Sequence, residues 1–274
     1  MRKDYHLHTE VSDGRWLPAD IFRTAARLGI DEISITDHDA VGAYIHFGDV
    51  RRDAAAAGIR LVPGVELDSA HGGVEIHMLG YELDPVHPGL TAYLGEVQRL
   101  RRDRLQALVG RINDALDAPA LDAAAVFRPW RDTCMMPHLI QPLLVDGRFP
   151  DYRTAKRWIK ETVGLPVEVP KPAVADVIAL IRAAGGWAAL AHPGFCSGNG
   201  DLDLEAFVAA CRDWGMTGLE VEYRYRGSVE FPSRVEEDQF VARMRELARR
   251  FGLRATRGSD AHQAVEMETF AAAS

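Results

Sequence analysis

The first residues that could do chemistry are two histidines separated by one residue, His6 and His8, followed by Asp13. Alternate side chains of an extended strand share a face, so both imidazoles would point to the same side. Two such imidazoles can bind one metal ion, and a nearby carboxylate can complete the site. Because histidine pairs are also common on protein surfaces, the meaning of this pair depends on further ligands along the chain.

More imidazoles and carboxylates lie at or beside the C-terminal ends of apolar segments that we predict to be strands. They are His38, Glu66, His77, His192, Asp260 and His262. The carboxyl ends of the strands of a parallel barrel meet at one mouth, so all of these side chains would become neighbours there. Any one of the histidines is more often a hydrogen-bonded core or surface residue than a ligand. Their joint placement after strands favours a metal centre, because chance would also scatter histidines over helices.

The donor atoms of such a mouth indicate its chemistry. One ion takes about three or four protein ligands, so nine ligands with one bridging carboxylate suit two or three divalent ions. Imidazole and carboxylate without thiolate suit manganese, iron or zinc, and do not decide among them. Ions roughly 3.5–4 Å apart suit phosphoester hydrolysis, because they hold phosphate oxygens, generate a hydroxide near neutral pH and stabilise the leaving alkoxide.

Segments that could carry these residues alternate between strand and helix patterns, which predicts an α/β fold with a parallel sheet or barrel. Strands are expected at 4–8, 33–37, 60–65, 74–81, 187–191, 218–222 and 253–256. Helices are expected between them at 18–28, 42–57, 173–184, 204–214 and 234–251, and in a strandless region at 90–116, 135–145 and 152–162. The chain therefore divides into a barrel domain, residues 1–83 and 168–274, and a helical insertion, residues 84–167, expected to cap the substrate.

The composition is that of an ordinary globular protein, with 47% hydrophobic and 26% charged residues in a chain of 274. The formal net charge of −8 argues against a protein that coats long nucleic acid, but it allows a small anionic substrate. Three widely spaced cysteines, Cys134, Cys196 and Cys211, without a CxxC pair, favour a reducing cytoplasm and argue against a thiolate zinc site. No signal peptide or membrane span is predicted, and the oligomeric state is not predictable.

Together these residues resemble the PHP family, the polymerase and histidinol phosphatase family of metal-dependent phosphoesterases. The resemblance runs over nearly the whole chain and rests on His6-x-His8, Asp13, Thr36-Asp37-His38-Asp39, Gly64-Val65-Glu66, the run from His77 to Tyr81, Ala191-His192-Pro193 and Gly258-Ser259-Asp260-x-His262. The insertion carries Pro137-His138 and Gly147, and Val169-Pro170-Lys171 follows it and leads back into the barrel. That arrangement is similar to the stand-alone bacterial members that act on nucleotides.

The resemblance implies a distorted (β/α)7 TIM-like barrel with three metal positions and manganese as the favoured ion. The first position would use His6, His8, Glu66 and Asp260, the second Glu66 as a bridge with His77 and His192, and the third Asp13, His38 and His262. The opening strand is then expected beside the last one. One departure from the family is Ala261-His262-Gln263, where relatives often have an aromatic residue and then a glycine.

The reaction that the resemblance implies is hydrolysis of a phosphomonoester by a metal-bound hydroxide, without a covalent enzyme intermediate. The expected catalytic residues are Glu66, His192 and Asp260. Candidates for binding the phosphate are Lys171, Arg224 and His138, each of which could equally be a solvated surface residue. The favoured substrate is a nucleotide: a nucleoside 3′,5′-bisphosphate, an AMP-like monophosphate or the 5′ end of a short oligoribonucleotide.

Two other functions remain open. The chain could be a phosphatase for a sugar or amino-alcohol phosphate such as histidinol phosphate, which a side-by-side panel of substrates would separate from the nucleotide hypothesis. It could also be a non-catalytic module in which metal stabilises the structure or the binding of a partner. Residues that can ligate metal at all three positions argue against that module, whereas bound metal without activity on a broad phosphoester panel would support it.

Overall fold

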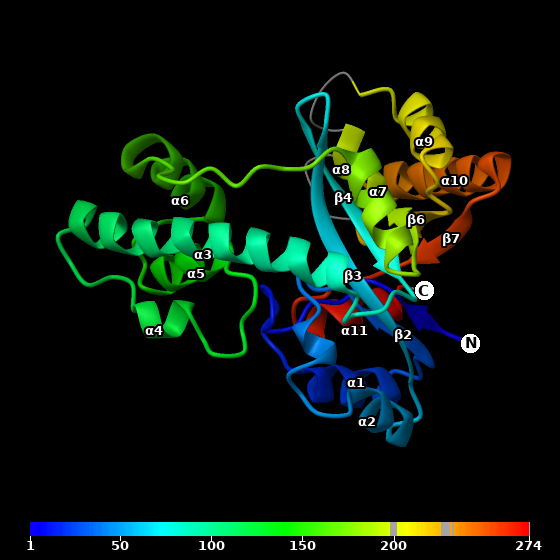
Figure 1. Cartoon of the computed structure of the whole chain (residues 1–274), viewed down its shortest axis with the longest axis horizontal. Helices are drawn as coiled ribbons and strands as arrows, with labels where there is room; N and C mark the ends of the chain where they lie inside the picture. The colour runs from blue at the N-terminus through cyan, green and yellow to red at the C-terminus, as the bar shows by residue number, and fades with distance from the viewer. Residues whose placement is uncertain (198–201, 226–230, 232, 274) are drawn as a thin grey trace.

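Seven strands form one sheet that curls into a nearly closed barrel in the computed structural model, which describes residues 1–197, 202–225, 231 and 233–273 (Figure 1). The strands are β1 (Lys3–Asp4), β2 (Glu32–Ile35), β3 (Arg60–His71), β4 (Val74–Tyr81), β5 (Trp187–Leu190), β6 (Gly218–Glu222) and β7 (Arg254–Arg257). They follow one another around the sheet in chain order. The predicted distorted TIM-like barrel is confirmed.

The two ends of the chain close the barrel. Leu7 forms a parallel bridge with Ala261, and His8 donates its backbone N–H to the Ala261 carbonyl at 3.1 Å. The predicted contact between the opening segment and the end of the chain is therefore confirmed. It places residues 6–8 beside residues 260–262, at the mouth where both segments carry imidazoles.

The opening strand is shorter than the predicted 4–8, since β1 ends at Asp4. The Asp4 carboxylate is fully buried. One of its oxygens accepts the backbone N–H of Ser259 at 2.9 Å and that of His6 at 3.4 Å. Because a side chain takes up backbone donors that a regular ladder would use, the following residues lie between β2 and the end of β7 without regular strand pairing.

β4 runs antiparallel to both of its neighbours, β3 and β5, so the expectation of a uniformly parallel sheet is wrong here. Gly72 and Gly73 join β3 to β4 with φ angles of 57° and 82°. Two consecutive residues with positive φ make a hairpin turn whose twist matches the flanking strands, and glycine adopts it without steric cost. The hairpin puts His77 opposite Asp68 of β3, which explains how a histidine inside a strand reaches the mouth.

Helices cover the barrel and fill the insertion. Those of the barrel are α1 (Pro18–Arg27), α2 (Val50–Ala56), α7 (Val174–Ala183), α8 (Pro193–Ser197), α9 (Leu204–Asp213), α10 (Arg234–Phe251) and α11 (Ala264–Ala272). Those of the insertion are α3 (Pro88–Ala115), α4 (Ala123–Val126), α5 (Met136–Val145) and α6 (Tyr152–Trp158). A short 3₁₀ helix spans Gly42–Tyr44, and a π-helical turn spans Ile159–Val163.

Three of these helices are not apparent from the sequence pattern, and one predicted helix is wrong. α4 and α8 have only four and five residues, too few for a periodic signal, and the alternating apolar and acidic residues of α11 hide its helical period. The helix predicted at 42–57 is interrupted at Gly48, which has φ of 75°. α2 begins after Asp49, whose carboxylate caps it by accepting the Arg52 N–H at 3.0 Å.

The insertion has a buried apolar cluster of its own. Leu108, from the second half of α3, packs in this cluster with Leu139 and Ile159. Leu90 and Leu94, from the first half of α3, belong instead to the main core of the barrel. Figure 1 shows α3 extending from the barrel to the left, where α4, α5 and α6 surround it. Among the helices of the described ranges, none combines the length and the apolar character that a bilayer span requires.

Candidate metal centre

The side chains of His6 and His8 converge on two carboxylates at the mouth of the barrel. Their Nε2 atoms lie 3.1 and 3.3 Å from Glu66 Oε2, and 3.4 and 2.9 Å from Asp260 Oδ1. These four residues each offer a ligand atom within 4.8 Å of the others. The structure thus brings together two imidazoles from the start of the chain, a carboxylate of β3 and a carboxylate that follows β7.

Glu66 also faces two more imidazoles with its other oxygen. His77 Nδ1 lies 2.9 Å from Glu66 Oε1, and His192 Nε2 lies 3.1 Å from the same atom. Oε2 of this carboxylate therefore faces His6 and His8, while Oε1 faces His77 and His192. A carboxylate with imidazoles on both oxygens has the geometry of a ligand that can bridge two ions.

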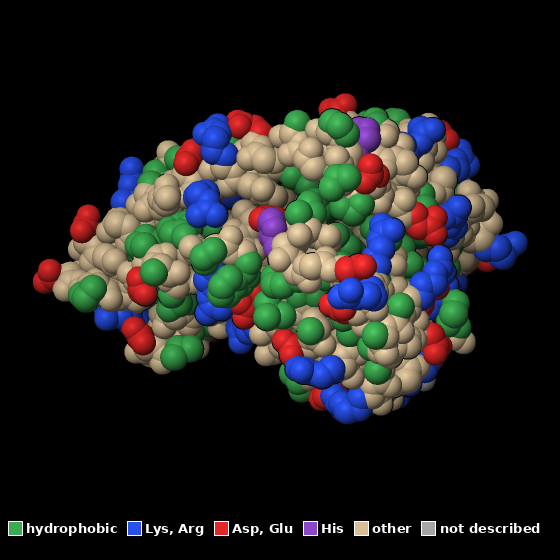
Figure 2. Space-filling model, turned by 60° about the horizontal axis from the view of Figure 1, so that its bottom comes forward, with side chains coloured by type: hydrophobic (Ala, Val, Ile, Leu, Met, Phe, Trp, Pro, Cys, Tyr) green, Lys and Arg blue, Asp and Glu red, His purple; other side chains and the backbone are tan. Residues whose placement is uncertain are grey.

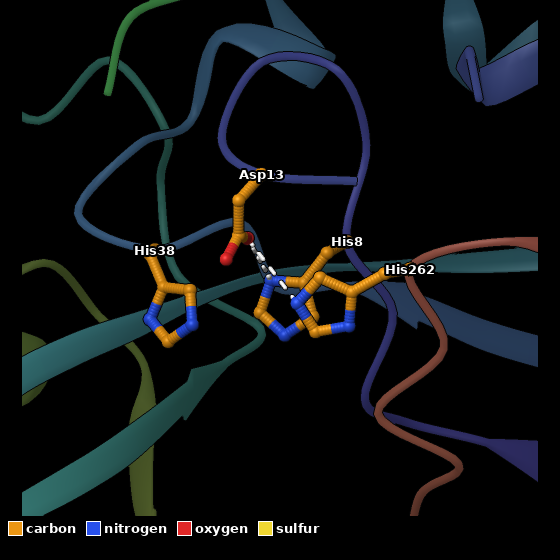
Figure 3. A group of neighbouring side chains, drawn as sticks. All are labelled: His8, Asp13, His38 and His262. Carbon is orange, nitrogen blue, oxygen red and sulfur yellow. Dashed lines mark ion pairs between the residues drawn. The ribbon is translucent and has the colours of Figure 1, made fainter. Parts of the chain in front are cut away.

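A third group contains His8, Asp13, His38 and His262, whose ligand atoms also lie within 4.8 Å of one another (Figure 3). Asp13 Oδ1 lies 3.2 Å from His262 Nε2 and 4.0 Å from His8 Nδ1. The rings of His38 and His262 stack on the His8 ring, with centroids 4.6 and 4.4 Å away. His8 thus lies between two groups, because its Nδ1 faces Asp13 and its Nε2 faces the first group.

Asp68 is a carboxylate of the mouth that the sequence motifs do not include. Its Oδ1 lies 3.6 Å from His38 Nδ1 and 3.4 Å from His77 Nε2, and these three residues form a fourth group of potential ligands. A sequence signal for it does exist. Asp68 follows Glu66 by two residues on β3, and the period of two places both side chains on one face of the strand.

Glu220 of β6 holds two of the imidazole residues in place. Its Oε1 lies 3.1 Å from His6 Nδ1, and its Oε2 accepts the backbone N–H of His192 at 2.6 Å. Tyr223 plays a similar part beyond the end of β6, since its hydroxyl donates to Asp260 Oδ2 at 2.8 Å. Neither residue carries a motif, so only the folded chain identifies them as neighbours of the centre.

Three residues at the mouth have left-handed backbone conformations that side chains other than glycine rarely adopt. The φ angles are 45° for Asp39, 27° for His192 and 52° for Asp260. Each conformation costs free energy, so it persists only where the surroundings hold it, and such residues concentrate at functional sites. His192 and Asp260 both follow the ends of strands, so these sharp bends direct their side chains into the mouth.

The charges of the centre shift the pKa values of its members in opposite directions. Burial lowers the pKa of His6, but the surrounding carboxylates, Glu66 first, outweigh burial and hold that pKa well above its ordinary value. Burial raises the pKa of Glu66, but the neighbouring imidazoles outweigh it and hold that pKa well below its ordinary range. Burial likewise lowers the pKa values of His38 and His262, but the neighbouring carboxylates outweigh it and raise them to about 9 and about 10. A divalent cation can replace the protons that these imidazoles would carry.

Several polar atoms of the mouth are buried and make no hydrogen bond of normal geometry in the described part of the chain, although some of them lie within ion-pair distance of one another. They are His8 Nδ1 and Nε2, Asp13 Oδ1, His38 Nδ1, Asp68 Oδ1, His192 Nδ1 and Asp260 Oδ1. A buried polar atom left without a partner costs about 1–3 kcal/mol. Coordination to cations would satisfy these atoms, and the nitrogen and oxygen donors suit divalent metal ions. The residues present therefore fit a metal centre.

The mouth opens into a cavity between the barrel and the insertion. His77, His192 and Asp260 line a space of about 340 Å³ together with Lys156 of α6. Lys156 and Glu75 also line a second cavity of about 450 Å³. Figure 2 shows a histidine and an acidic side chain at the surface where the insertion on the left meets the barrel on the right, with basic side chains on the insertion beside them.

The three basic residues predicted to bind phosphate lie in three different places. Lys171 lines the cavity of about 450 Å³, and its Nζ lies 3.4 Å from Asp68 Oδ2. His138 lines another cavity of about 290 Å³, and burial lowers its pKa to about 4, so it carries no charge near neutral pH. Arg224 lines a third cavity of about 270 Å³ and lies 3.8 Å from Glu266. Lys171 shares its cavity with Asp13 and Asp68, and His138 shares its cavity with Asp13, whereas none of the proposed metal ligands lines the cavity of Arg224.

Comparison with known proteins agrees with this geometry. The model of the PHP domain matches residues 4–165, which is more than half of the chain. A 5′-3′ exoribonuclease of Haemophilus influenzae is 26% identical over 260 residues, covering 94% of this chain and 89% of the relative. A 3′,5′-nucleoside bisphosphate phosphatase of Chromobacterium violaceum is 29% identical over 220 residues, covering 80% of this chain and 75% of the relative.

A solved structure from Bifidobacterium adolescentis, of a protein assigned as a metal-dependent phosphoesterase, superposes with a TM-score of 0.77. The two chains are 25% identical, and the match covers 96% of this chain and 88% of the other. The family match covers the motifs from His6 to Tyr81 and nearly all of the insertion. The structural match covers both the barrel and the insertion. The chain therefore belongs to the PHP domain family and is a metal-dependent phosphoric ester hydrolase.

Proposed function

We propose that this chain hydrolyses the phosphomonoester of a nucleotide: a nucleoside 3′,5′-bisphosphate, an AMP-like monophosphate or the 5′ end of a short oligoribonucleotide. The observation that carries the proposal is the cleft between barrel and insertion, which has the metal centre at one end and basic side chains at the other. The names of two similar proteins, an exoribonuclease and a nucleoside bisphosphate phosphatase, support the same class of substrate.

The basic end of the cleft suits a second anionic group of the substrate. Lys156 lines both cavities and is exposed, and it has no ion-pair partner among the described side chains. Arg104, Lys160 and Lys171 line the larger cavity with it, and so does the aromatic ring of Tyr152. A volume of about 450 Å³ falls within the roughly 300–1,000 Å³ that is usual for small-molecule sites. We propose that the insertion, residues 84–167, acts as the cap of this site.

We propose that two or three divalent ions occupy the centre, with manganese favoured. The ligands would be His6, His8, Glu66 and Asp260 for the first ion, Glu66, His77 and His192 for the second, and Asp13, His38 and His262 for the third. When bound, such ions would supply positive charge to the phosphate oxygens and acidify the attacking water. Glu66, His192 and Asp260 are the proposed catalytic residues, because His192 and Asp260 line the cavity and the Glu66 carboxylate faces both His8 and His192.

The remaining side chains of the mouth have positioning roles in this proposal. Glu220 orients the His6 ring, and Tyr223 orients the Asp260 carboxylate. Lys156 would hold the phosphate while water attacks in line with the leaving oxygen, since phosphoryl transfer depends mainly on positioning and on stabilised charge. Cys196 also lines the cavity, but burial raises the pKa of its thiol to about 12. It therefore stays protonated near neutral pH, which supports hydrolysis without a covalent intermediate.

The test is phosphate release by the manganese-loaded protein from adenosine 3′,5′-bisphosphate, AMP, a 5′-phosphorylated trinucleotide, histidinol phosphate and a sugar phosphate. We expect the highest kcat/KM for one of the nucleotides. Lys156→Met should raise KM for that substrate about tenfold or more, because the substrate loses a charge-assisted contact. Arg153→Met is the matched control, since Arg153 is exposed on the same helix and lines neither cavity. A preference for histidinol phosphate, or equal KM values in both variants, would contradict the proposal.

A further inference from the structure

Asp68 is placed by the β3–β4 hairpin directly opposite His77. It also lies two residues after Glu66 on the same strand, so both carboxylates are on the face that looks into the mouth. Its side chain is only 8% exposed. A carboxylate buried to this degree requires partners for both of its oxygens.

The two oxygens of Asp68 face different partners. Oδ2 lies 2.8 Å from Arg101 Nη2 and 3.4 Å from Lys171 Nζ, so it is fully engaged with cations. Oδ1 has no hydrogen-bond partner among the described residues, and the same is true of His38 Nδ1, which lies 3.6 Å away. His77 Nε2 lies 3.4 Å from the same oxygen. The free oxygen thus points at two imidazoles but makes a hydrogen bond of normal geometry with neither. His77 Nε2 lies closer to Glu75 Oε1, at 3.2 Å.

These separations match the edges of a metal site better than they match hydrogen bonds. Around a tetrahedral ion with bonds of about 2.0–2.1 Å, neighbouring ligand atoms lie roughly 3.3–3.4 Å apart. A separation of 3.6 Å between Asp68 Oδ1 and His38 Nδ1 is too long for a hydrogen bond. His38, Asp68 and His77 also satisfy the mutual spacing expected of atoms around one ion.

Arg101 fixes the direction in which Asp68 points. It extends from α3, is 13% exposed, and pairs with Asp39 Oδ2 at 2.6 Å as well as with Asp68. The Asp39 carbonyl in turn accepts from Gln98 Nε2 at 2.8 Å and from Thr133 Oγ1 at 3.1 Å. Residues of the insertion therefore hold Oδ2 of Asp68 from one side, which leaves Oδ1 for the mouth.

We propose that Asp68 is a further direct ligand of one of the divalent ions of this centre, on the side where His38 and His77 lie, and that Arg101 is the positioning residue that presents it. The inference rests on the proposed metal centre but not on the identity of the substrate. It adds a carboxylate to the nine ligands that the motifs imply. The insertion helix α3 would then support the metal site through Arg101, in addition to lining the cleft.

The test compares the full-length protein with Asp68→Asn and Asp39→Asn. The number of retained manganese ions and their affinities are measured by elemental analysis and by titration of the metal-free protein. Asparagine keeps the shape and can still accept a hydrogen bond, but it lacks the charge of a strong ligand. We expect Asp68→Asn to retain one ion fewer, or to bind one ion at least tenfold more weakly. Asp39→Asn, which breaks the same pairing with Arg101, should retain the full number.

Unchanged ion number and affinities in Asp68→Asn would overturn the inference, and so would an equal loss in both variants, because that would assign the effect to the ion pair. A wild-type protein that binds no ion would instead overturn the proposed function. Anomalous diffraction from manganese-soaked wild-type crystals tests directly, without any variant, whether Asp68 is a metal ligand. We expect a peak about 2.0–2.4 Å from Asp68 Oδ1, and peaks only elsewhere would contradict the assignment.

The positioning role of Arg101 has its own readout. Arg101→Gln should keep the ion number but weaken the affinity for the ion at Asp68 about 10- to 100-fold, as is usual when a group that orients a ligand is lost. Arg101→Lys, which restores one charged contact, should recover part of that affinity. If Arg101→Gln and Arg101→Lys bound the ion at Asp68 with equal affinity, or if only the thermal stability changed, Arg101 would have a purely structural role. Either result would contradict this part of the inference.

Discussion

His8 and Asp260, from opposite ends of the chain, meet with 2.9 Å between Nε2 and Oδ1. Asp260 reaches this position through a left-handed backbone bend with φ of 52°, and Tyr223 holds its other oxygen. His8 is held by the bridge between its neighbour Leu7 and Ala261. The contact that closes the barrel therefore also brings the residues of the metal centre together.

Replacement of His8 by alanine should abolish phosphate release and leave the fold intact. The imidazole belongs to two groups of potential ligands, so its loss should lower turnover by more than the roughly 10- to 100-fold typical of losing an orienting neighbour. Phosphate release is measured together with circular dichroism and the melting temperature. His46→Ala is the control, because His46 pairs with Asp132 outside these groups. Undiminished turnover in His8→Ala would exclude the proposed metal mechanism.

Glu220→Gln should weaken metal binding about 10- to 100-fold, because Glu220 orients the His6 ring and the His192 backbone without being a proposed ligand. Glutamine has nearly the same size, and its carbonyl oxygen can still accept the His192 N–H. The loss should therefore be smaller than that in His6→Ala, as measured by competition with a chelator. A loss as large as that of His6→Ala would mean that Glu220 is itself a ligand.

The metal-free protein should lose stability as the pH rises from about 6.5 to about 10. His38 and His262 have folded-state pKa values of about 9 and about 10, raised above the ordinary 6.5. Their protons therefore stabilise the fold fully below pH 6.5, and this contribution is lost as the pH rises through the folded values. Melting temperatures in a chelator-containing buffer series measure the effect. The manganese-loaded protein should lack this decline, because neutral imidazoles bind the ions; a flat profile without metal would contradict the prediction.

Leu139→Ala should destabilise the insertion and leave the metal centre intact. Leu139 is fully buried in the cluster that contains Leu108 and Ile159, and removing such a side chain costs about 2–5 kcal/mol. Limited proteolysis should then cut within residues 84–167 first, and KM for the nucleotide should rise while the ion number stays constant. A protein that loses its ions in step with the cleavage would show that the insertion and the centre do not unfold separately.

Several features of this fold follow from local sequence alone. The strand and helix patterns predict all seven strand segments and most helices, because apolar periodicity and glycine turns are local properties. The motif residues are predictable as a set, since ligand chemistry is a property of residue type. The antiparallel direction of β4 is also predictable from the sequence, because the pair Gly72-Gly73 is typical of a tight hairpin.

Other features depend on residues that are distant in sequence. Nothing near Arg101 indicates that it reaches Asp39 and Asp68 across the junction between insertion and barrel. Lys156 is one of several basic residues on its helix, and only the packing of α6 over the mouth separates it from Arg153. Glu220 is an acidic residue in an apolar strand until barrel closure places it beside His6.

The sequence by itself determined the kind of chemistry that this protein can do: imidazoles and carboxylates able to bind metal, at or near strand ends, and a helical segment inserted into an α/β barrel. Those are fixed by residue type and by periods of two and of 3.6 residues, which need no long-range contact. The tertiary structure alone decided which imidazoles and carboxylates lie together, that Arg101 pairs with Asp39 and Asp68, and that Lys156 lines the cavity at the mouth. Such pairings depend on distances of a few ångströms between segments far apart in the chain, and only the closed barrel and the packed insertion set them.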